Sequence, residues 1–306
     1  MNQVIKFYIT IFLFSSILLS QSIPYFDSEK AFNFILKQCD MGPRFPGSDG
    51  HVNFSKYLKK YLSKQDGDTL ITYNHKIKHP YEDKDITLIN FLYRFNKDAD
   101  NRMMFMAHWD TREIADKDSN PDNQNKPILG ANDGASGVAV LMVLAEILSD
   151  FPLENIGVDL LFVDGEDMGR NGELENFCIG TTKFCEVIPD PYPKYAICLD
   201  MVADKDPSFP IEYFSYIQAP WLVNEIWTLA NNLGYDEFKT NVVGPIYDDH
   251  RALYLNSYIP AIDIIDFDYP YWHTLGDTPE NCSAETLKIV GNVVCEFIYR
   301  KDYESR

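Results

Sequence analysis

The chain has 306 residues, of which 45% are hydrophobic, and it carries a formal net charge of −19 at pH 7. A chain of this length can bury a large core and is compatible with one large α/β domain. Such an acidic protein is a poor partner for nucleic acid or for anionic membranes, because both carry dense negative charge.

Residues 1–21 have the features of a secretory signal peptide. One basic residue precedes an almost unbroken apolar run over residues 7–19, and small polar residues follow it. The run is short for a membrane span, so we expect cleavage near Ser20 or Gln21 and no stable membrane anchor afterwards. The sequence thus predicts an exported protein, periplasmic or secreted, with a folded domain over residues 22–306.

The part of the chain up to residue 95 combines two predicted helices with two predicted strands. One helix begins near Ser28, a breaker-rich loop covers residues 42–48, and a second helix is predicted over 51–62. Runs rich in β-branched and aromatic residues predict strands over 69–73 and 86–95. The first strand suits the edge of a sheet, whereas the second is apolar enough to lie in its centre.

The middle of the chain alternates buried strands with polar segments. Strands are predicted over 103–107 and 156–163, because each is a short apolar run bounded by polar residues. A long polar loop over 111–129 lies between them, and a helix with a broad apolar face is expected to begin at Asp133. Alternation of strands with helices is typical of α/β proteins.

The rest of the chain continues this alternation after an irregular segment over 168–193. We predict strands over 195–199, 211–216 and 259–265, and helices over 221–233, from Asp248 onward, and over 284–299. No internal repeat or second-domain boundary is visible. The predicted fold class is α/β, a single-domain three-layer α/β/α arrangement around a central mixed, mostly parallel sheet.

Six cysteines occur, and their spacings match no zinc motif. Cys198 lies within the predicted strand over 195–199, so we expect a buried free thiol there. An exported protein permits disulfides. If one forms, Cys178 and Cys185 are the pair that we expect.

Potential metal ligands follow two of the predicted strands and occupy the segment between them. His108 and Asp110 follow the first strand, Asp133 lies in a glycine-rich turn, and Glu166 and Asp167 follow the second strand. Because the carboxyl ends of parallel strands meet at one edge of an open sheet, these side chains are expected to line one crevice. Oxygen and imidazole ligands without thiolates suit a zinc ion that keeps positions open for water or substrate.

The adjacent acids Glu166 and Asp167 are informative as a pair. Two neighbouring side chains in an extended or turn segment point in different directions. One can therefore bind a metal while the other carries a proton, which is the minimal equipment for attack on an amide carbonyl. The alternative interpretation is a solvated turn over residues 164–167.

Seven short motifs carry a family resemblance that covers nearly the whole chain after residue 21. They are Gly42-Pro43-Arg44-x-Pro46-Gly47-Ser48, Ala107-His108-Trp109-Asp110-Thr111-Arg112, Gly130-Ala131-Asn132-Asp133-Gly134-Ala135-Ser136-Gly137, Asp164-Gly165-Glu166-Asp167, Leu199-Asp200-Met201-Val202, Asp248-Asp249-His250 and Trp272-His273-Thr274-x-x-Asp277-Thr278. With these motifs the chain resembles the M28 metallopeptidase superfamily and, within it, the bacterial, animal-type glutaminyl cyclases, also called glutaminyl-peptide cyclotransferases. The resemblance implies a zinc-aminopeptidase-like fold.

The resemblance also implies a metal site. Carried over position by position, Asp133, Asp167 and His273 would hold one Zn²⁺ per chain. His108 is a metal ligand in the two-metal aminopeptidases of this superfamily and lies near the site in the cyclases. The acid at Asp167 is a departure, because the animal cyclases have Glu there.

The remaining roles concern catalysis. By resemblance, Glu166 would be the general acid and base, and Asp200 and Asp248 would hydrogen-bond the reacting groups. Trp272 would pack against the substrate's glutaminyl side chain. Asp263 is a second departure, since the animal enzymes have His at that position.

The implied activity converts N-terminal glutamine of peptides or proteins to pyroglutamate with release of ammonia. The alternative within the superfamily is a zinc aminopeptidase that uses two metals to hydrolyse N-terminal residues. Trp272 before His273, together with Asp248-Asp249-His250, favours the cyclase. A non-catalytic binding domain is the third hypothesis, and the presence of every ligand and of Glu166 argues against it.

Overall fold

The computed structural model describes residues 23–306, so the predicted signal peptide lies outside the described residues. The helices and strands, in chain order, are α1 (Ser28–Cys39), α2 (Asp49–Leu62), β1 (Thr69–Lys78), β2 (Asp85–Phe95), β3 (Arg102–His108), α3 (Ala135–Asp150), β4 (Gly157–Val163), the 3₁₀ turn η1 (Leu174–Asn176), α4 (Ile179–Phe184), β5 (Ala196–Asp200), β6 (Phe209–Ile211), α5 (Tyr213–Gln218), α6 (Pro220–Asn232), β7 (Phe238–Val242), α7 (Asp249–Ser257), β8 (Ala261–Ile265), η2 (Pro279–Asn281) and α8 (Ala284–Glu304).

A six-stranded mixed sheet forms the centre of the molecule, in the order β1-β2-β4-β3-β5-β8. Strands β4, β3, β5 and β8 are parallel to one another, whereas β2 pairs antiparallel with both β1 and β4. The edge position of β1 and the inner position of β2 agree with their sequence patterns. Every residue of β3 and β4 is buried, as expected of strands covered on both faces.

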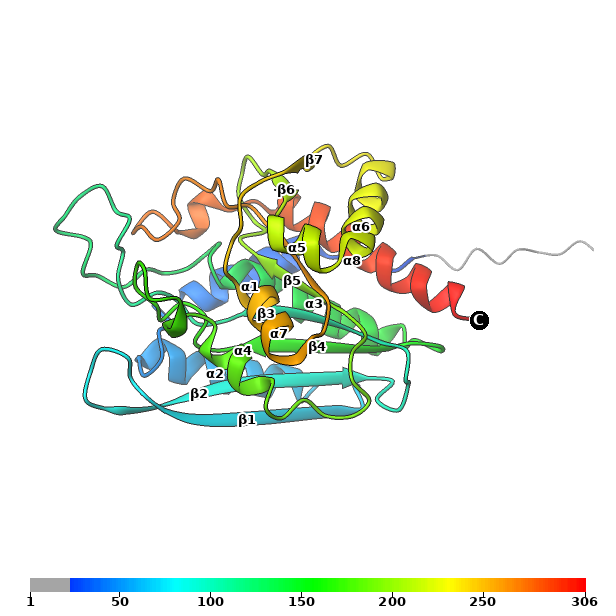
Figure 1. Ribbon diagram of the computed structural model, residues 1–306, viewed down its shortest axis with the longest axis horizontal. Helices are drawn as coiled ribbons and strands as arrows, with labels where there is room; N and C mark the ends of the chain where they lie inside the picture. The colour runs from blue at the N-terminus through cyan, green and yellow to red at the C-terminus, as the bar shows by residue number, and fades with distance from the viewer. Residues whose placement is uncertain (1–22) are drawn as a thin grey trace, which may run out of the picture.

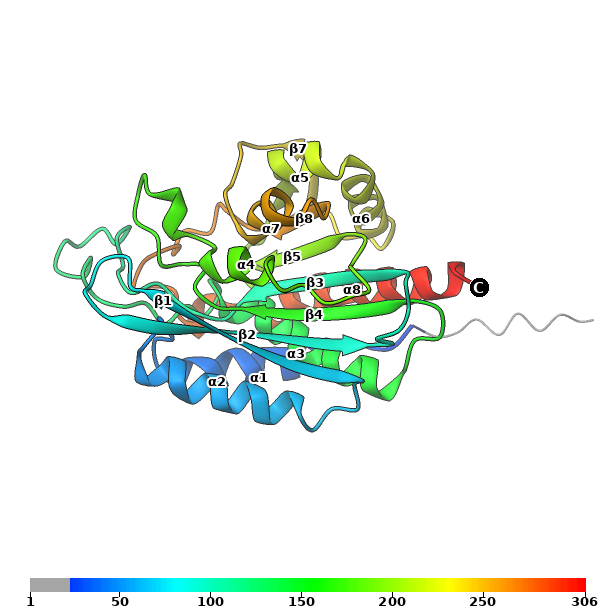
Figure 2. The same ribbon diagram turned by 60° about the horizontal axis from the view of Figure 1, so that its bottom comes forward.

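Helices cover both faces of the sheet, and the predicted three-layer α/β/α class is confirmed. Figure 2 shows α1, α2 and α3 beneath the sheet, with α4, α5 and α7 above it. Helix α3 packs against β3 and β5 on one side and against α1 and α8 on the other. This sandwiched position explains why α3 is apolar almost all round, with thirteen of its sixteen residues buried.

The loops that follow the parallel strands gather at one end of the sheet. Figure 1 shows the long segment between β3 and α3 and the segment between β8 and α8 extending from the same end. The chain termini of the described fold lie toward the opposite end. This arrangement places the candidate ligand residues together, as the carboxyl-end rule for open sheets requires.

The strand predicted over 211–216 is wrong. Strand β6 ends at Ile211, and the short helix α5 begins at Tyr213. The Glu212 carboxylate caps that helix by accepting hydrogen bonds from the backbone N–H groups of Phe214 and Ser215. The β-branched and aromatic residues that indicated a strand are also compatible with a capped helix.

Other sequence expectations need smaller corrections. Helix α3 begins at Ala135 rather than at Asp133. Helix α1 begins at Ser28 as expected, and Asp27 caps it. The segment over 168–193 contains η1 and α4, and β7 was not predicted.

The expected disulfide does not form, since all six cysteines are free thiols. Cys178 and Cys185 lie at opposite ends of α4. The six residues of α4 lie between them, so their Cα atoms are roughly 10 Å apart. That distance exceeds the reach of a disulfide.

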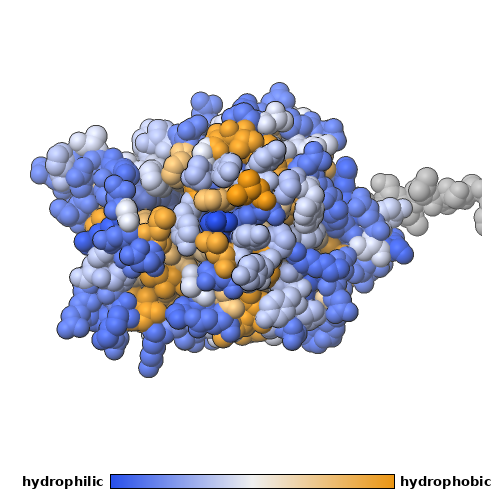
Figure 3. Space-filling model, in the orientation of Figure 1, coloured by the Kyte–Doolittle hydropathy of each residue, from blue (hydrophilic) through white to orange (hydrophobic). Residues whose placement is uncertain are grey.

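The surface is largely hydrophilic, with apolar residues in separate patches, as Figure 3 shows for one face. Exposed apolar side chains on this surface include Ile217 and Leu255. Within residues 23–306, no helix combines the length and the apolar character that crossing a membrane requires.

Candidate active site

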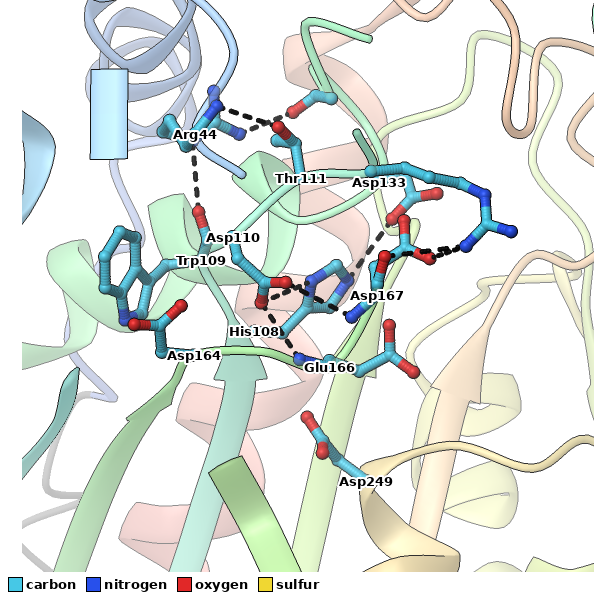
Figure 4. Close-up of polar contacts among 12 residues, drawn as sticks. Arg44, His108, Trp109, Asp110, Thr111, Asp133, Asp164, Glu166, Asp167 and Asp249 are labelled. Carbon is cyan, nitrogen blue, oxygen red and sulfur yellow. Dashed lines mark hydrogen bonds and ion pairs between the residues drawn. The ribbon is translucent and has the colours of Figure 1, made fainter. Parts of the chain in front are cut away.

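The ends of β3 and β4 are joined by the carboxylate of Asp110. Its two oxygens accept the backbone N–H groups of Glu166 and Asp167 at 3.1 and 3.2 Å, as Figure 4 shows. Asp110, a potential metal ligand by its sequence position, has Oδ1 3.7 Å from His108 Nδ1. The geometry makes it the acceptor that fixes the turn carrying the two adjacent acids.

A buried guanidinium holds the loops on the other side of this turn. Arg44 is fully buried and donates to the backbone carbonyls of Trp109, Leu129 and Gly130 at 2.8–3.1 Å. Gly134 then allows the chain to pass close to β3, because a Cβ there would lie 2.5 Å from the Asp110 carbonyl oxygen. Its φ of +94° also favours glycine.

Asp133, Asp167 and His273 form the first group of potential metal ligands. Their ligand atoms all lie within 4.8 Å of one another, and all three residues are buried. His273 Nε2 lies 3.6 Å from Asp133 Oδ2 and 3.5 Å from Asp167 Oδ1. His273 reaches this position with φ of +55°, a conformation that residues other than glycine rarely adopt.

The chemistry of this group fits a divalent cation. Asp167 Oδ2 is buried and has no hydrogen-bond partner among residues 23–306, and a second carboxylate, that of Asp133, lies close to it. Burial raises the pKa of the Asp167 carboxyl to about 6, while His273 and Arg112 oppose that rise. Two carboxylate oxygens and one imidazole nitrogen are the ligand types that zinc takes in sites with open positions.

Neighbouring residues orient the three side chains. Arg112 donates to Asp167 Oδ1 at 2.7 Å, and Asp116 Oδ1 lies 3.3 Å from His273 Nδ1. The Asp277 carboxylate accepts the backbone N–H of Asp133 at 3.2 Å. A carboxylate behind a ligand histidine is a common arrangement in metal sites, because it fixes the ring and its tautomer.

A second group shares Asp133 with the first. The ligand atoms of His108, Asp133 and Asp200 also lie within 4.8 Å of one another. His108 Nε2 is 3.3 Å from Asp133 Oδ1 and 3.2 Å from Asp200 Oδ1. The two oxygens of Asp133 therefore face two different groups, which is the arrangement of a carboxylate that can bridge two metals.

Glu166 lies beside both groups and is 8% exposed. Burial raises the pKa of its carboxyl well above the ordinary value; the nearby Asp167, Asp248 and Asp249 add to the rise, while His108 opposes it. A buried carboxylic acid with a raised pKa can exchange a proton with a substrate near neutral pH.

Helix α7 brings further acids toward Glu166. Asp248 caps the helix and accepts the backbone N–H of Asp249, and both side chains are buried. On the same helix, His250 Nε2 lies 3.0 Å from Glu212 Oε2, and His250 Nδ1 lies 3.5 Å from Asp263 Oδ2. The Glu212–His250 contact joins α7 to α5 and so holds Asp248 in place.

A pocket connects these residues to the surface. Its empty volume is about 360 Å³, part of it open to solvent. The lining comprises Asp133, Glu166, Asp167, Phe177, Asp200, Ile246, Tyr247, Asp248, Ile265, Phe267, Trp272 and His273. Trp272 stacks on His273 with ring centroids 3.9 Å apart and packs on Phe267 at 4.8 Å, so the acids face an aromatic wall.

Seven of the predicted site residues line this pocket, namely Asp133, Glu166, Asp167, Asp200, Asp248, Trp272 and His273. His108 does not line it, but contacts Asp133 and Asp200. Sequence reasoning missed Arg112, Cys178 and Asp277 as contacts of the site. Arg112 and Asp277 lie within quoted motifs, so the motifs carried a signal for them. Cys178 lies in no motif, and only the fold reveals its contact with Glu166.

The chain matches the model of Peptidase family M28 over residues 90–298. Its structure is also similar to a leucine aminopeptidase precursor from Bacteroides thetaiotaomicron, with a TM-score of 0.87 and 32% sequence identity. That similarity covers 91% of this chain and 98% of the other.

Two glutaminyl cyclases are equally similar. The enzyme from Bacteroides thetaiotaomicron, bound to N-acetylhistamine, has a TM-score of 0.86 and 32% identity, over 91% of this chain and 99% of the other. The enzyme from Porphyromonas gingivalis has the same TM-score and identity, over 90% of this chain and 99% of the other. Overall likeness therefore establishes the family without separating the two activities.

Proposed function

The chain belongs to Peptidase family M28, and we propose that within this family it is a zinc-dependent glutaminyl-peptide cyclotransferase. Its substrates are peptides or proteins with N-terminal glutamine, and its products are the pyroglutamyl chain and ammonia. The observation that carries the proposal is the position of Glu166, a buried acid that faces a cation-ligand group and an aromatic wall across one small pocket.

The pocket suits a reaction within one substrate residue. Trp272 and Phe267 form an apolar wall against which a glutaminyl chain can pack. Folding that chain back brings its α-amine close to its own γ-carbonyl carbon. Because the nucleophile belongs to the substrate, correct placement supplies much of the rate enhancement.

Glu166 carries the proton in this scheme. Its carboxylate takes a proton from the α-amine as the new C–N bond forms to the carbonyl carbon of the side-chain amide. The same group then gives the proton to the departing amide nitrogen, which leaves as ammonia when the old C–N bond breaks. Asp200 and Asp248 lie on the pocket wall beside Glu166, where they can hydrogen-bond the amine and the leaving group.

Zinc would be held by Asp133, Asp167 and His273, and when bound it supplies a positive charge that stabilises the oxyanion of the γ-amide. Arg112 fixes the orientation of Asp167, and Asp116 fixes that of His273. We expect one ion per chain.

The test is ammonia release from a glutaminyl dipeptide, measured on purified protein before and after chelation. We predict that Glu166→Gln lowers kcat by about 10²–10⁴-fold, since it removes the group that transfers the proton. Glu175→Gln is the matched control, because Glu175 is an exposed acid in the same segment after β4. A Glu166→Gln variant that keeps full turnover would contradict the proposed role of Glu166 in proton transfer.

The second candidate function is a two-metal aminopeptidase. It is favoured by one observation, the group of His108, Asp133 and Asp200 that shares Asp133 with the first group. Two zinc ions per chain, together with amino acids released from peptides lacking N-terminal glutamine, would favour this candidate. One zinc ion with a pyroglutamyl product favours the cyclase.

We also propose that the protein is exported, on the basis of the apolar run near its start. Exported peptides with N-terminal glutamine would then be its substrate pool. N-terminal sequencing of the protein from its native envelope or medium tests this, because a start at residue 1 contradicts it.

A further inference from the structure

We propose that Cys178 is a positioning residue, whose thiol fixes the carboxylate of Glu166 for proton transfer. The proposal depends on the acid and base role proposed for Glu166. It also rests on contacts that would exist whichever of the two reactions the enzyme performs.

Cys178 contacts both the main chain and the side chain of Glu166. Its backbone N–H donates to the Glu166 carbonyl at 2.8 Å. Its thiol donates to Glu166 Oε1 with an Sγ–Oε1 distance of 3.4 Å, well within the range for a sulfur donor. One residue therefore holds Glu166 at two points, while Asp110 holds its backbone N–H from the other side.

The thiol is the one hydrogen-bond partner that the Glu166 carboxylate has among residues 23–306. Neighbouring acids surround it, but no described arginine, lysine or hydroxyl group donates to it. Nearby Arg112 is engaged by Asp116 and Asp167. Without the thiol, no hydrogen bond from the described part of the chain would fix the orientation of the Glu166 carboxylate.

The local backbone is built to deliver this thiol. Cys178 precedes α4 as its N-cap, a position where Ser, Thr, Asp and Asn usually bond the helix, yet its side chain makes no capping bond. Its φ is +52°, the left-handed conformation that costs a non-glycine residue energy. The Cys178 side chain therefore does not bond the end of the helix, and its thiol donates to Glu166 instead.

The start of α4 docks on the same turn. The backbone N–H of Ile179 donates to the Gly165 carbonyl at 2.9 Å. Gly180 permits that approach, since a Cβ there would lie 1.8 Å from the Asp164 carbonyl oxygen. The cysteine is thus held against the turn by its own backbone N–H and by the close approach of the two residues that follow it.

The kinetic test compares Cys178→Ala with Cys178→Ser. Alanine removes the donor, so we expect kcat to fall about ten-fold with KM unchanged, as befits loss of one hydrogen bond to a charged group. Serine restores an O–H donor, so we expect kcat within about three-fold of the wild type. A wild-type kcat in Cys178→Ala, or a Cys178→Ser variant as slow as Cys178→Ala, would overturn the proposal.

Cys295→Ala controls for the loss of a buried thiol. Cys295 is buried in α8, and its thiol has no hydrogen-bond partner among the described residues. We expect this variant to lose thermal stability as Cys178→Ala does, with kcat unchanged. If Cys295→Ala slows turnover equally, the effect belongs to packing and the proposal fails.

A spectroscopic arm separates this proposal from the proposed reaction. The S–H stretching band of Cys178 is isolated as the infrared difference between wild type and Cys178→Ser, on metal-free protein. We expect the frequency of this band to lie below that of the Cys295 band, because a hydrogen bond lowers an S–H stretching frequency. Glu166→Gln should raise the frequency, because an amide oxygen is a weaker acceptor than a carboxylate oxygen. A band that Glu166→Gln does not move contradicts the contact, whereas a wild type that forms no pyroglutamate contradicts only the proposed function.

Discussion

The two ends of the parallel sheet bury charge in opposite ways. At the amino end of β4, Asp159 is buried between two buried arginines, with Arg94 Nε at 3.0 Å and Arg102 Nη1 at 2.7 Å from one carboxylate oxygen. At the carboxyl end of the same strand, Glu166 and Asp167 share the interior with many more acids than cations.

The difference separates structure from function. Burial raises the pKa of Asp159, and both arginines oppose the rise. At the other end Asp249 and Asp263 are buried, and within residues 23–306 their carboxylate oxygens have no hydrogen-bond partner. Burial raises their pKa values well above the ordinary range. Buried acids that the described side chains leave without a counter-charge are typical of functional sites.

The largest change in stability is expected at the amino end of β4, where arginines pair with the buried acid. Asp159→Asn leaves two buried guanidinium groups without a counter-charge, so we predict a loss of about 3–5 kcal/mol in the free energy of unfolding. The measurement is denaturant unfolding with turnover assayed in parallel. Asp98→Asn is the control, since Asp98 pairs with Lys97 on the surface and should cost little. A drop in kcat for folded Asp159→Asn would break the distinction between the two ends.

At the carboxyl end of the sheet, replacing a buried acid should stabilise the protein instead of destabilising it. Asp266 follows β8, is 1% exposed, and burial raises its pKa to about 7 from 3.8. The folded state then holds a proton that the unfolded state has lost, so wild-type stability falls as pH rises from about 4 to about 7. Asp266→Asn avoids that loss.

We therefore expect the stability advantage of Asp266→Asn to grow across this window, by up to about 4 kcal/mol for a three-unit shift. Thermal unfolding at pH 4 and pH 8 measures it. An advantage that is equal at both pH values would show that the Asp266 carboxyl titrates normally.

A smaller effect should follow from adding zinc to the protein. We predict that zinc at 100 times its Kd stabilises metal-free protein by about 3 kcal/mol, because only the folded state presents Asp133, Asp167 and His273 together. Asp133→Asn should abolish most of this gain, and Asp122→Asn, an exposed acid in the loop over 111–129, should keep it. Equal gains in both variants would place the ion elsewhere.

Much of this organisation could be predicted from the sequence because it depends on short-range patterns. The runs that became β3 and β4 are apolar on both faces, and their terminal acids belong to motifs whose spacing the sequence displays directly. Helix α7 could also be predicted, since Asp248 precedes it as a cap.

The parts that could not be predicted depend on contacts between distant residues. The thiol of Cys178 meets Glu166 only because α4 docks on the turn after β4, and no periodicity encodes that docking. Helix α5 was mistaken for a strand because its apolar residues suit either state, and the Glu212 cap decided between them. Glu212 also contacts His250, which is 38 residues away in the sequence, so this contact could not be predicted from local patterns.

Asp133 has a consequence for how this family diversifies. Its two oxygens serve two adjacent ligand groups, so the count of metal ions is decided by the other members of each group and not by the shared acid. We expect a scaffold of this kind to exchange hydrolysis for ring closure, or the reverse, through a few substitutions on the pocket wall. The sheet and its helices would pass unchanged through such a transition, and relatives of near-identical shape would then differ in the reaction they perform.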